Sequence, residues 1–268
     1  LNSRCGYHHA ISRHDIDYTD LAVNSHFEGF LRECKGNVLI NCAGYIGKPN
    51  VDACEKAKYD TLLGNVVLPQ HLARVCLDYG ITFVHISSGC IYSGSELFTE
   101  KDKPNFSFDT GGSFYSGTKA LAEDVITRVN PMAYQFRLRI PFDQHASPRN
   151  YLTKCLSYDR LIEVHNSISH REDFVQACLD MVEGAGPPGI YNVVNPGPVY
   201  TSDVTSILEM YGHLPKDGAF EFFDNYDAFT SETVAARSNC TLSSDKIESC
   251  VNIRSAEQAL HEACKIYS

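Results

Sequence analysis

Short apolar runs alternate with longer amphipathic stretches along most of the chain, a pattern typical of an α/β fold. Residues 37–43, 81–88 and 133–140 form runs of strand length that are apolar enough to be buried on both faces. Residues 51–79 and 113–130 instead carry their apolar side chains at helical spacing. We therefore expect a doubly wound parallel sheet of the Rossmann type with helices on its faces.

The three predicted strands end at residues suited to ligand binding. The first is followed by Gly44, the second ends at Ser88 and the third stops at Pro141. In an open parallel sheet, ligands bind at the carboxyl ends of the strands. We therefore expect the three strand ends to form one site.

The pattern is more broken after residue 142. Strand-like runs at 161–164 and 189–194 flank a helical stretch at 173–183. We expect residues 1–142 to form a dinucleotide-binding domain and residues 143–268 to form mainly a smaller substrate-binding lobe, with some elements that return to the main sheet. The segment 184–189 formally matches G-x-G-x-x-G, but its two prolines and the lack of a preceding strand indicate a loop.

No glycine-rich phosphate loop precedes Asn37, although a dinucleotide fold needs one to hold the pyrophosphate. Residues 11–17 look like the end of the third strand of such a sheet. We therefore expect the chain as given to begin after the first βαβ segment, which leaves the dinucleotide-binding domain N-terminally incomplete.

Composition narrows the function classes. A net charge of -10 and a pI near 5.5 argue against a partner that is a nucleic acid or an anionic membrane surface. Residues 1–18 lack the pattern of a signal peptide, and no apolar run has the length of a membrane span. The 11 cysteines include no C-x-x-C, so we expect reduced thiols, a cytoplasmic location and no metal site.

Tyr115 is followed by Lys119 on one face of the predicted helix, and Ser88 ends the strand before it. Ketone reduction needs a proton on oxygen, and a phenol of pKa about 10 is a poor donor near neutral pH. A nearby ammonium stabilises the phenolate, and a hydroxyl orients the carbonyl. By itself, Tyr-x-x-x-Lys is better explained by a buried tyrosine with a satisfied hydroxyl and a lysine on a solvated face, so its context decides.

Several motifs occur in a specific order along the chain. Asp15-Ile16-Asp17 and Asn41-Cys42-Ala43-Gly44 are followed by Ser88, Tyr115 and Lys119. This order resembles that of extended short-chain dehydrogenases/reductases. Segments 43–52, 88–92, 112–120, 148–150 and 237–239 more narrowly resemble the nucleotide-rhamnose synthase (3,5-epimerase/4-reductase) branch of the dTDP-4-dehydrorhamnose reductase family. The resemblance begins near Asp15 and is looser after about Leu161.

The resemblance implies an enzyme that uses NADPH, with NADH as an alternative, to reduce a 4-keto-6-deoxyhexose attached to dTDP or UDP. It implies that Tyr115 donates the proton, that Lys119 binds the nicotinamide ribose and lowers the tyrosine pKa, and that Ser88 binds the carbonyl. Further implied cofactor contacts are Asp15, Ile16, Ala43, Gly44, Asn65 and Phe142. Asn65 is also expected to brace the strand that ends at Ser88. A homodimer is a further expectation.

Cys90, two residues after Ser88, matches the position of the acid/base cysteine of nucleotide-sugar epimerase/reductases, and Lys154 matches its basic partner. Epimerisation beside a ketone needs a base on one face of the carbon and an acid on the other. Taken alone, Cys90 is explained as a small buried hydrophobe and Lys154 as a solvated helix charge. We expect a bifunctional epimerase/reductase, and a plain reductase stays open.

Substrate contacts are expected from polar residues near the predicted site, where arginine suits a diphosphate: Lys48, Asn50, Arg149, Asn150 and Arg237. The alternative class is a non-catalytic subunit built on the same fold, because the phosphate loop is not visible. The presence of Ser88, Cys90, Tyr115 and Lys119 together favours the enzyme.

Overall fold

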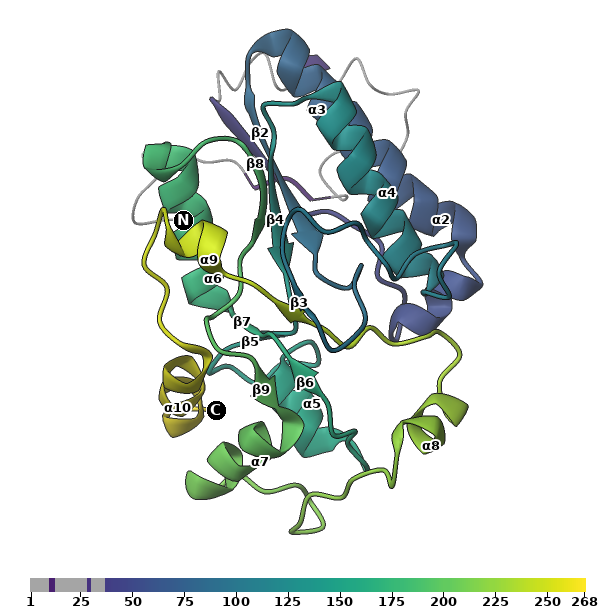
Figure 1. Ribbon diagram of the computed structural model, residues 1–268, viewed down its shortest axis with the longest axis vertical. Helices are drawn as coiled ribbons and strands as arrows, with labels where there is room; N and C mark the ends of the chain where they lie inside the picture. The colour runs from purple at the N-terminus through teal and green to yellow at the C-terminus, as the bar shows by residue number, and fades with distance from the viewer. Residues whose placement is uncertain (1–9, 13–27, 30–36) are drawn as a thin grey trace.

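The computed structural model describes residues 10–12, 28–29 and 37–268, which form the sheet and helices shown in Figure 1. Its centre is a parallel sheet in the order β1 (Val38–Asn41), β2 (Thr82–Ser88), β4 (Tyr134–Leu138) and β8 (Gly189–Asn192). The three strands predicted to supply the site are therefore neighbours. The predicted parallel α/β fold is confirmed.

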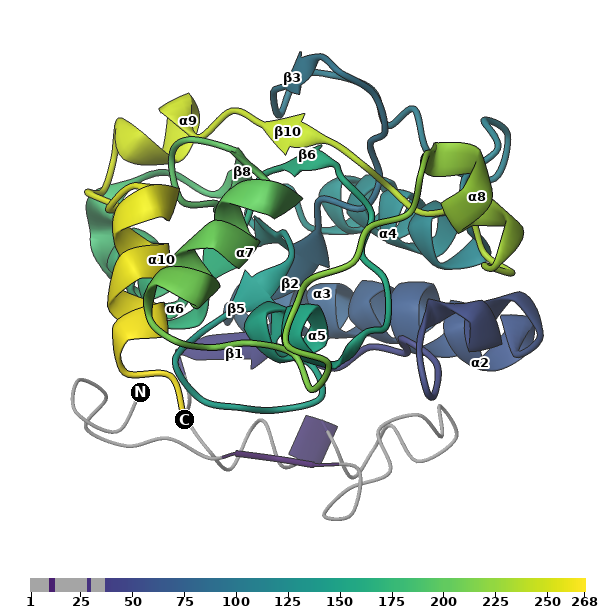
Figure 2. The same ribbon diagram turned by 90° about the horizontal axis from the view of Figure 1, so that it is seen from below.

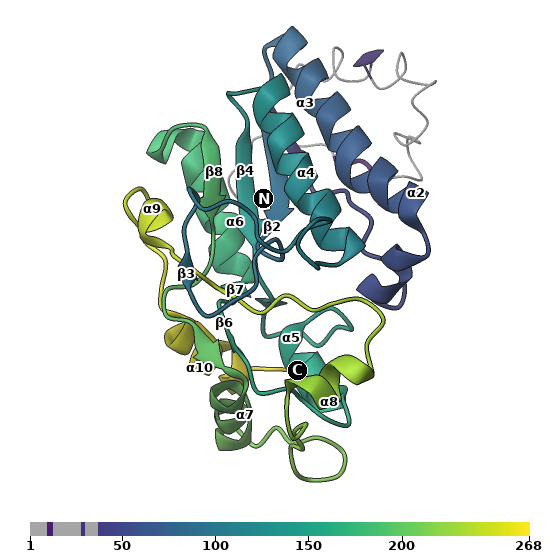
Figure 3. The same cartoon turned by 45° about the vertical axis from the view of Figure 1, so that its right-hand side comes forward.

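Helices cover both faces of this sheet. On one face, α3 (Leu68–Tyr79) and α4 (Phe114–Val129) pack on Phe83 through an apolar cluster that includes Leu72 and Ile126. On the other face, α6 (Arg171–Asp180) and the π-turn η4 (Met181–Ala185) pack on Val84. Phe83 and Val84 are adjacent on β2, and their opposite burial follows from the alternation of side chains along a strand. Figure 3 shows α3 and α4 side by side against the sheet.

The connection from β1 to α3 contains three short helical pieces instead of one helix over 51–79. These are η2 (Val51–Glu55), α2 (Lys58–Leu62) and the π-turn η3 (Leu63–Val67). The helical structure is interrupted at 56–57, so the predicted helix is continuous only from α2 to α3. Single π-turns inside helices occur frequently at functional sites.

The rest of the chain after β4 forms a second group of elements below the sheet (Figures 1 and 2). A buried apolar cluster around Phe142, Leu152, Val204 and Leu260 holds it together. Its elements are β5 (Pro141–Phe142), α5 (Tyr151–Ser157), β6 (His165–Asn166), β7 (Ser169–His170), β9 (Val199–Tyr200), α7 (Thr201–Met210), α8 (Tyr226–Ser231) and α10 (Ala256–Lys265).

Two pairs of segments connect this group to the sheet. β3 (Leu97–Phe98) pairs with β10 (Thr241–Leu242), and α9 (Asp245–Glu248) lies next to β8. The strand expected over 161–164 is not formed, because only Leu161 makes a bridge, to Phe222, and the next strand begins at His165. β8 pairs with β4, so a segment after residue 142 adds to the main sheet. The domain division at residue 142 stays a prediction.

A buried ion pair fixes α4 to the sheet. Arg137 on β4 and Glu123 on α4 are 2% and 5% exposed, and Arg137 Nη2 lies 2.8 Å from Glu123 Oε2. Ser87 Oγ donates to Glu123 Oε1 over 2.7 Å, and Arg137 Nη1 donates to Asn192 Oδ1 over 3.1 Å. Charges removed from water need partners of this kind. The pair therefore connects α4 to β2, β4 and β8.

Glu123→Gln is expected to lower the free energy of unfolding by about 3–5 kcal/mol, because it leaves the Arg137 charge buried without a carboxylate. Urea denaturation measures this loss. Arg128→Ala is the matched control, since Arg128 pairs with Asp124 on the same helix with side chains 75% and 54% exposed. Exposed pairs of this type contribute about 0.2–1 kcal/mol. Equal losses in the two variants would contradict the role of the buried pair.

Candidate active site

The first turn of α4 is fixed by contacts at its N-terminus. Ser113 Oγ accepts a hydrogen bond from Ser116 N over 3.1 Å, and Glu55 Oε1 accepts one from Phe114 N over 2.7 Å. The Glu55 carboxylate thus lies at the positive end of the helix, where a negative charge is stabilised. Tyr115 is the next residue of this anchored turn.

Tyr115 interacts with Ser88, which lies at the carboxyl end of β2 and is 7% exposed. Burial raises the pKa of the Tyr115 phenol above its usual range, the charge of Cys90 adds to this, and a hydrogen bond from Ser88 opposes both. The expectation of a lowered tyrosine pKa is thus corrected, because the desolvation of the phenolate outweighs the groups that stabilise it. Tyr115 is a protonated phenol at neutral pH and is suited to act as an acid.

Lys119 lies one turn after Tyr115 and is 5% exposed. Its Nζ donates to Ile86 O over 3.4 Å, which places the amine against β2. Burial lowers the pKa of Lys119 from 10.5 to about 8, although Glu123 and Cys90 act in the opposite direction. Lys119 therefore carries its charge at neutral pH and loses it near pH 8.

Cys90 lies where several charged side chains converge. Arg139, which follows β4, donates Nη1 to Cys90 Sγ over 3.0 Å. Lys154 on α5 interacts electrostatically with Cys90, while burial and then Arg149 lower the pKa of Lys154. The structure thus brings Ser88, Cys90, Tyr115, Lys119 and Lys154 to one end of the sheet.

Arg139 is a site residue that the sequence interpretation missed. It lies near the end of the apolar run 133–140. A charged residue at the end of a strand predicted to be buried is the feature of the sequence that could have indicated it. Gly89 permits the close packing beside it, because a Cβ at this position would lie 2.5 Å from Leu242 Cδ1 and 3.5 Å from Arg139 Cδ.

Asn65 holds the segment that follows β1. Its Oδ1 accepts from Tyr45 N over 2.7 Å, and its Nδ2 donates to Tyr45 O over 2.9 Å and to Thr118 Oγ1 over 3.1 Å. Asn65 therefore braces the 43–45 segment and α4, not the strand that ends at Ser88 as expected. Gly44 approaches it closely, since a Cβ there would lie 3.1 Å from Asn65 Oδ1. Ala43 is half-buried and Gly44 is exposed at the end of β1.

Other predicted site residues have structural partners instead. Phe142 is 0% exposed inside the apolar cluster around α5 and α10, so it has no surface to offer a cofactor, contrary to expectation. Asn150 is also 0% exposed and caps α5, since its Oδ1 accepts from Leu152 N while its Nδ2 donates to Asp143 and to His145 O. These two expectations are corrected by burial.

The remaining predicted substrate contacts differ in their exposure and in the partners of their side chains. Asn50 is exposed but caps η2 through a hydrogen bond from Asp52 N over 2.9 Å. Arg237 forms a two-pronged ion pair with Asp52 over 2.8 and 3.0 Å. Lys48 and Arg149 are exposed. Asp15 and Ile16 lie outside the described residues.

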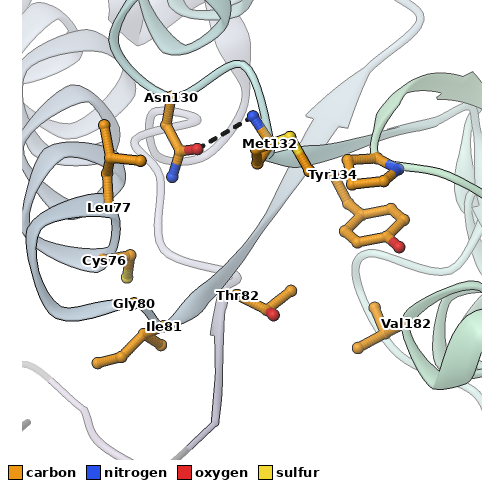
Figure 4. Close-up of a pocket in the computed structure, with 10 residues that line it drawn as sticks. Cys76, Leu77, Gly80, Ile81, Thr82, Asn130, Met132, Tyr134 and Val182 are labelled. Atoms are coloured by element: carbon orange, nitrogen blue, oxygen red, sulfur yellow. Dashed lines mark hydrogen bonds between the residues drawn. The ribbon is translucent and has the colours of Figure 1, made fainter.

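A cavity of about 310 Å³ lies at the other end of the sheet (Figure 4). Its lining includes Thr82 and Tyr134, the first residues of β2 and β4, together with Cys76, Leu77 and Met132. Since each residue of a strand advances about 3.3 Å, Thr82 lies roughly 20 Å from Ser88. This cavity is separate from the catalytic candidates.

The parallel sheet, with Ser88 at a strand end and Tyr115 and Lys119 on the next long helix, defines a short-chain dehydrogenase/reductase of the extended type. The sequence signature of the RmlD substrate binding domain matches residues 3–173. The chain belongs to this family and is an RmlD-family reductase. The family expected from the sequence is thereby confirmed.

Named relatives agree with this assignment. The chain is 33% identical over 232 residues to a bifunctional dTDP-4-dehydrorhamnose 3,5-epimerase/dTDP-4-dehydrorhamnose reductase of Arabidopsis thaliana, covering 81% of this chain and 72% of the relative. It is also 33% identical to a trifunctional UDP-glucose 4,6-dehydratase/UDP-4-keto-6-deoxy-D-glucose 3,5-epimerase/UDP-4-keto-L-rhamnose-reductase of the same plant. That match covers 81% of this chain but only 33% of the longer relative.

Solved structures share the fold over nearly the whole chain. The L780 UDP-rhamnose synthase from Acanthamoeba polyphaga mimivirus superposes with a TM-score of 0.85 at 25% identity, covering 96% of this chain and 89% of that one. A dTDP-4-dehydrorhamnose reductase from Bacillus anthracis in complex with NADP superposes with a TM-score of 0.79 at 15% identity, covering 95% and 88% of the two chains.

Proposed function

We propose that the chain reduces a nucleotide-linked 4-keto-6-deoxyhexose, dTDP- or UDP-4-dehydrorhamnose, to nucleotide-rhamnose, and that 3,5-epimerisation takes place in the same site. The observation that carries this proposal is the convergence of the Ser88 and Tyr115 pair with Cys90 and Lys154 at one end of the sheet. The activities named for the two plant relatives combine the same two reactions.

We assign the cofactor as NADPH, which supplies the hydride when bound; the Bacillus anthracis reductase with this fold binds NADP. The residues present fit a dinucleotide, because Gly44 exposes its backbone at the end of β1, where such a ligand crosses a parallel sheet. Ala43, Gly44 and Lys119 would hold it. The choice between dTDP and UDP does not change these contacts.

The side chains divide the two reactions between them. For reduction, Tyr115 holds the proton that is transferred to the C4 oxygen, Ser88 orients that oxygen, and the Lys119 ammonium stabilises the phenolate left behind. For epimerisation, Cys90 and Lys154 exchange protons with opposite faces of the carbon beside the ketone. Reduction and epimerisation thus use different side chains.

The test is to give the full-length protein UDP- or dTDP-4-keto-6-deoxyglucose with NADPH and to analyse the sugar product. Nucleotide-rhamnose is the expected product. A product whose C3 and C5 configuration is unchanged would reduce the proposal to a reductase. Failure to oxidise NADPH with either substrate would contradict the proposal.

Reduction is expected to depend on the charge of Lys119. Its pKa of about 8 lies below the ordinary value, so the ammonium is lost as the pH rises through 8, while the raised pKa of Tyr115 keeps the phenol protonated. We expect kcat/KM for reduction, which reports the free enzyme, to fall about tenfold per pH unit above pH 8. Lys119→Arg is expected to remove this decline, because arginine stays charged. A flat wild-type profile up to about pH 9.5 would show that reduction does not depend on the charge of Lys119.

We also place the protein in the cytoplasm and expect a homodimer. The nine cysteines among the described residues are all free thiols, which supports a reducing compartment. No helix in the described part of the chain has the length and apolar character needed to cross a membrane. Size measurement of the full-length protein in solution tests the dimer.

A further inference from the structure

Two arginines near the end of β4 are buried, and among the described residues only Arg137 has a carboxylate partner. Arg139 is 2% exposed, and its guanidinium donates to Cys90 Sγ, to Asn166 Oδ1 and to Ser238 O. No carboxylate of the described residues forms an ion pair with it. An arginine keeps its charge even when buried, and an unpaired buried charge costs several kcal/mol. The environment of Arg139 therefore favours an anion beside it.

Two cysteines lie close enough to supply that anion. Cys240 Sγ donates to Gly89 O over 3.5 Å, and burial raises the pKa of this thiol, so Cys240 stays protonated. Cys90 Sγ instead accepts from Arg139 Nη1 over 3.0 Å and is partly exposed. Cys90 is therefore the thiol that faces the Arg139 charge.

The other charged groups around Cys90 act in the same direction. Lys119 on α4 and Lys154 on α5 both interact electrostatically with Cys90, while Tyr115 on α4 is a neutral phenol. The Glu123 carboxylate on α4 is already paired with Arg137. Cations next to a cysteine favour the thiolate, which is the reactive form.

We propose that Arg139 holds Cys90 as a thiolate and is thereby a positioning residue for the epimerisation step. This inference rests on the proposed epimerase function. The Cys90 thiolate removes a proton from the carbon beside the ketone, and the electron pair of the broken C–H bond moves onto the C4 oxygen as an enolate. Lys154 returns a proton to the opposite face of the carbon as the ketone re-forms. The thiol and amine left behind are reset by proton exchange with water.

The thiolate is tested without substrate by alkylation of the full-length protein with iodoacetamide at a series of pH values, with each cysteine followed by peptide mass spectrometry. We expect Cys90 to reach half of its maximal rate at least about one pH unit below the value near 8.5 that is typical of a free thiol. Half-maximal reactivity at or above that value in the wild type would overturn the proposal. Cys250, which is partly exposed, is the internal reference.

Arg139→Met is expected to move the Cys90 midpoint up by one pH unit or more, which is about a tenfold loss of thiolate at neutral pH, and Arg139→Lys is expected to restore part of it. Asn166→Asp keeps the arginine but gives it a carboxylate, so it is expected to move the midpoint in the same direction. Arg171→Met is the matched control, because Arg171 pairs with Asp143. A Cys90 midpoint that is unchanged in both Arg139→Met and Asn166→Asp would overturn the proposal.

Substrate assays separate this inference from the epimerase function. In Arg139→Met, exchange of the C3 and C5 hydrogens with solvent deuterium is expected to slow about tenfold at neutral pH and to recover as the pH is raised, which a purely structural loss would not do. If the Cys90 midpoint depends on Arg139 but the wild-type protein shows no exchange, the epimerase function is wrong, and Arg139 does not act in epimerisation. If the wild-type protein shows exchange but the Cys90 midpoint does not depend on Arg139, only the proposed role of Arg139 is overturned.

Discussion

Replacing Tyr115 with phenylalanine is expected to lower kcat/KM for ketone reduction by about 10²–10⁴-fold, the usual contribution of a positioned general acid. The variant keeps the aromatic ring on the first turn of α4 but removes the hydroxyl that interacts with Ser88. Because the raised pKa keeps this phenol protonated at neutral pH, the loss is that of a proton donor. Steady-state oxidation of NADPH with a pre-epimerised 4-ketosugar measures it.

Tyr59→Phe is the matched control for this loss. Tyr59 lies on α2 with 76% of its surface exposed, so removal of its hydroxyl is expected to leave the rate unchanged. Binding of NADPH, followed by fluorescence titration, is expected to persist in Tyr115→Phe. A variant that retains more than about a tenth of the wild-type kcat/KM would rule out Tyr115 as the principal acid.

Cys90→Ser is expected to abolish the exchange of the C3 and C5 hydrogens with solvent deuterium, a loss of at least about 10²-fold. A serine hydroxyl at the position of Sγ remains neutral at physiological pH and cannot serve as the base that the thiolate provides. Reduction of a pre-epimerised substrate is expected to continue, because Tyr115 and Ser88 are unchanged. Mass spectrometry of the sugar in deuterated water measures the exchange.

Cys250→Ser serves as the control for Cys90→Ser, since the Cys250 thiol donates a hydrogen bond to Lys246 O and lies outside the site. Exchange at the wild-type rate in Cys90→Ser would refute the role of the cysteine. Parallel loss of exchange and reduction would instead show that the substitution had damaged the whole site.

The sequence was sufficient to predict elements that have a strong local pattern. The run 81–88 became β2 and the helical stretch 113–130 became α4, because each has consistent periodicity and a clear boundary, such as the Ser113 cap. The parallel arrangement of the strands then follows from the alternation of strands and helices. The same pattern predicts that Ser88 and Tyr115 lie near each other.

Several predicted site residues have partners that are distant in sequence. Phe142 belongs to a cluster formed with α10, and Arg237 is held by Asp52, which is 185 positions away. Asn65 binds Tyr45 and Thr118 because a π-turn points its amide between two elements. Periodicity does not encode such contacts.

The ion pair between Asp52 and Arg237 also has a consequence for how the protein folds. Together with the Arg139 to Ser238 hydrogen bond, which joins positions 99 apart, it connects the last part of the chain to elements made much earlier. Contacts of such large sequence separation incur the loop-closure entropy before they are formed, which slows folding. The local β1–α3–β2–α4 unit is therefore expected to form first, and the surroundings of Arg139 and Cys90 to become ordered only when the segment 235–240 docks. During synthesis, reactivity of this cysteine would report the arrival of the C-terminal segment.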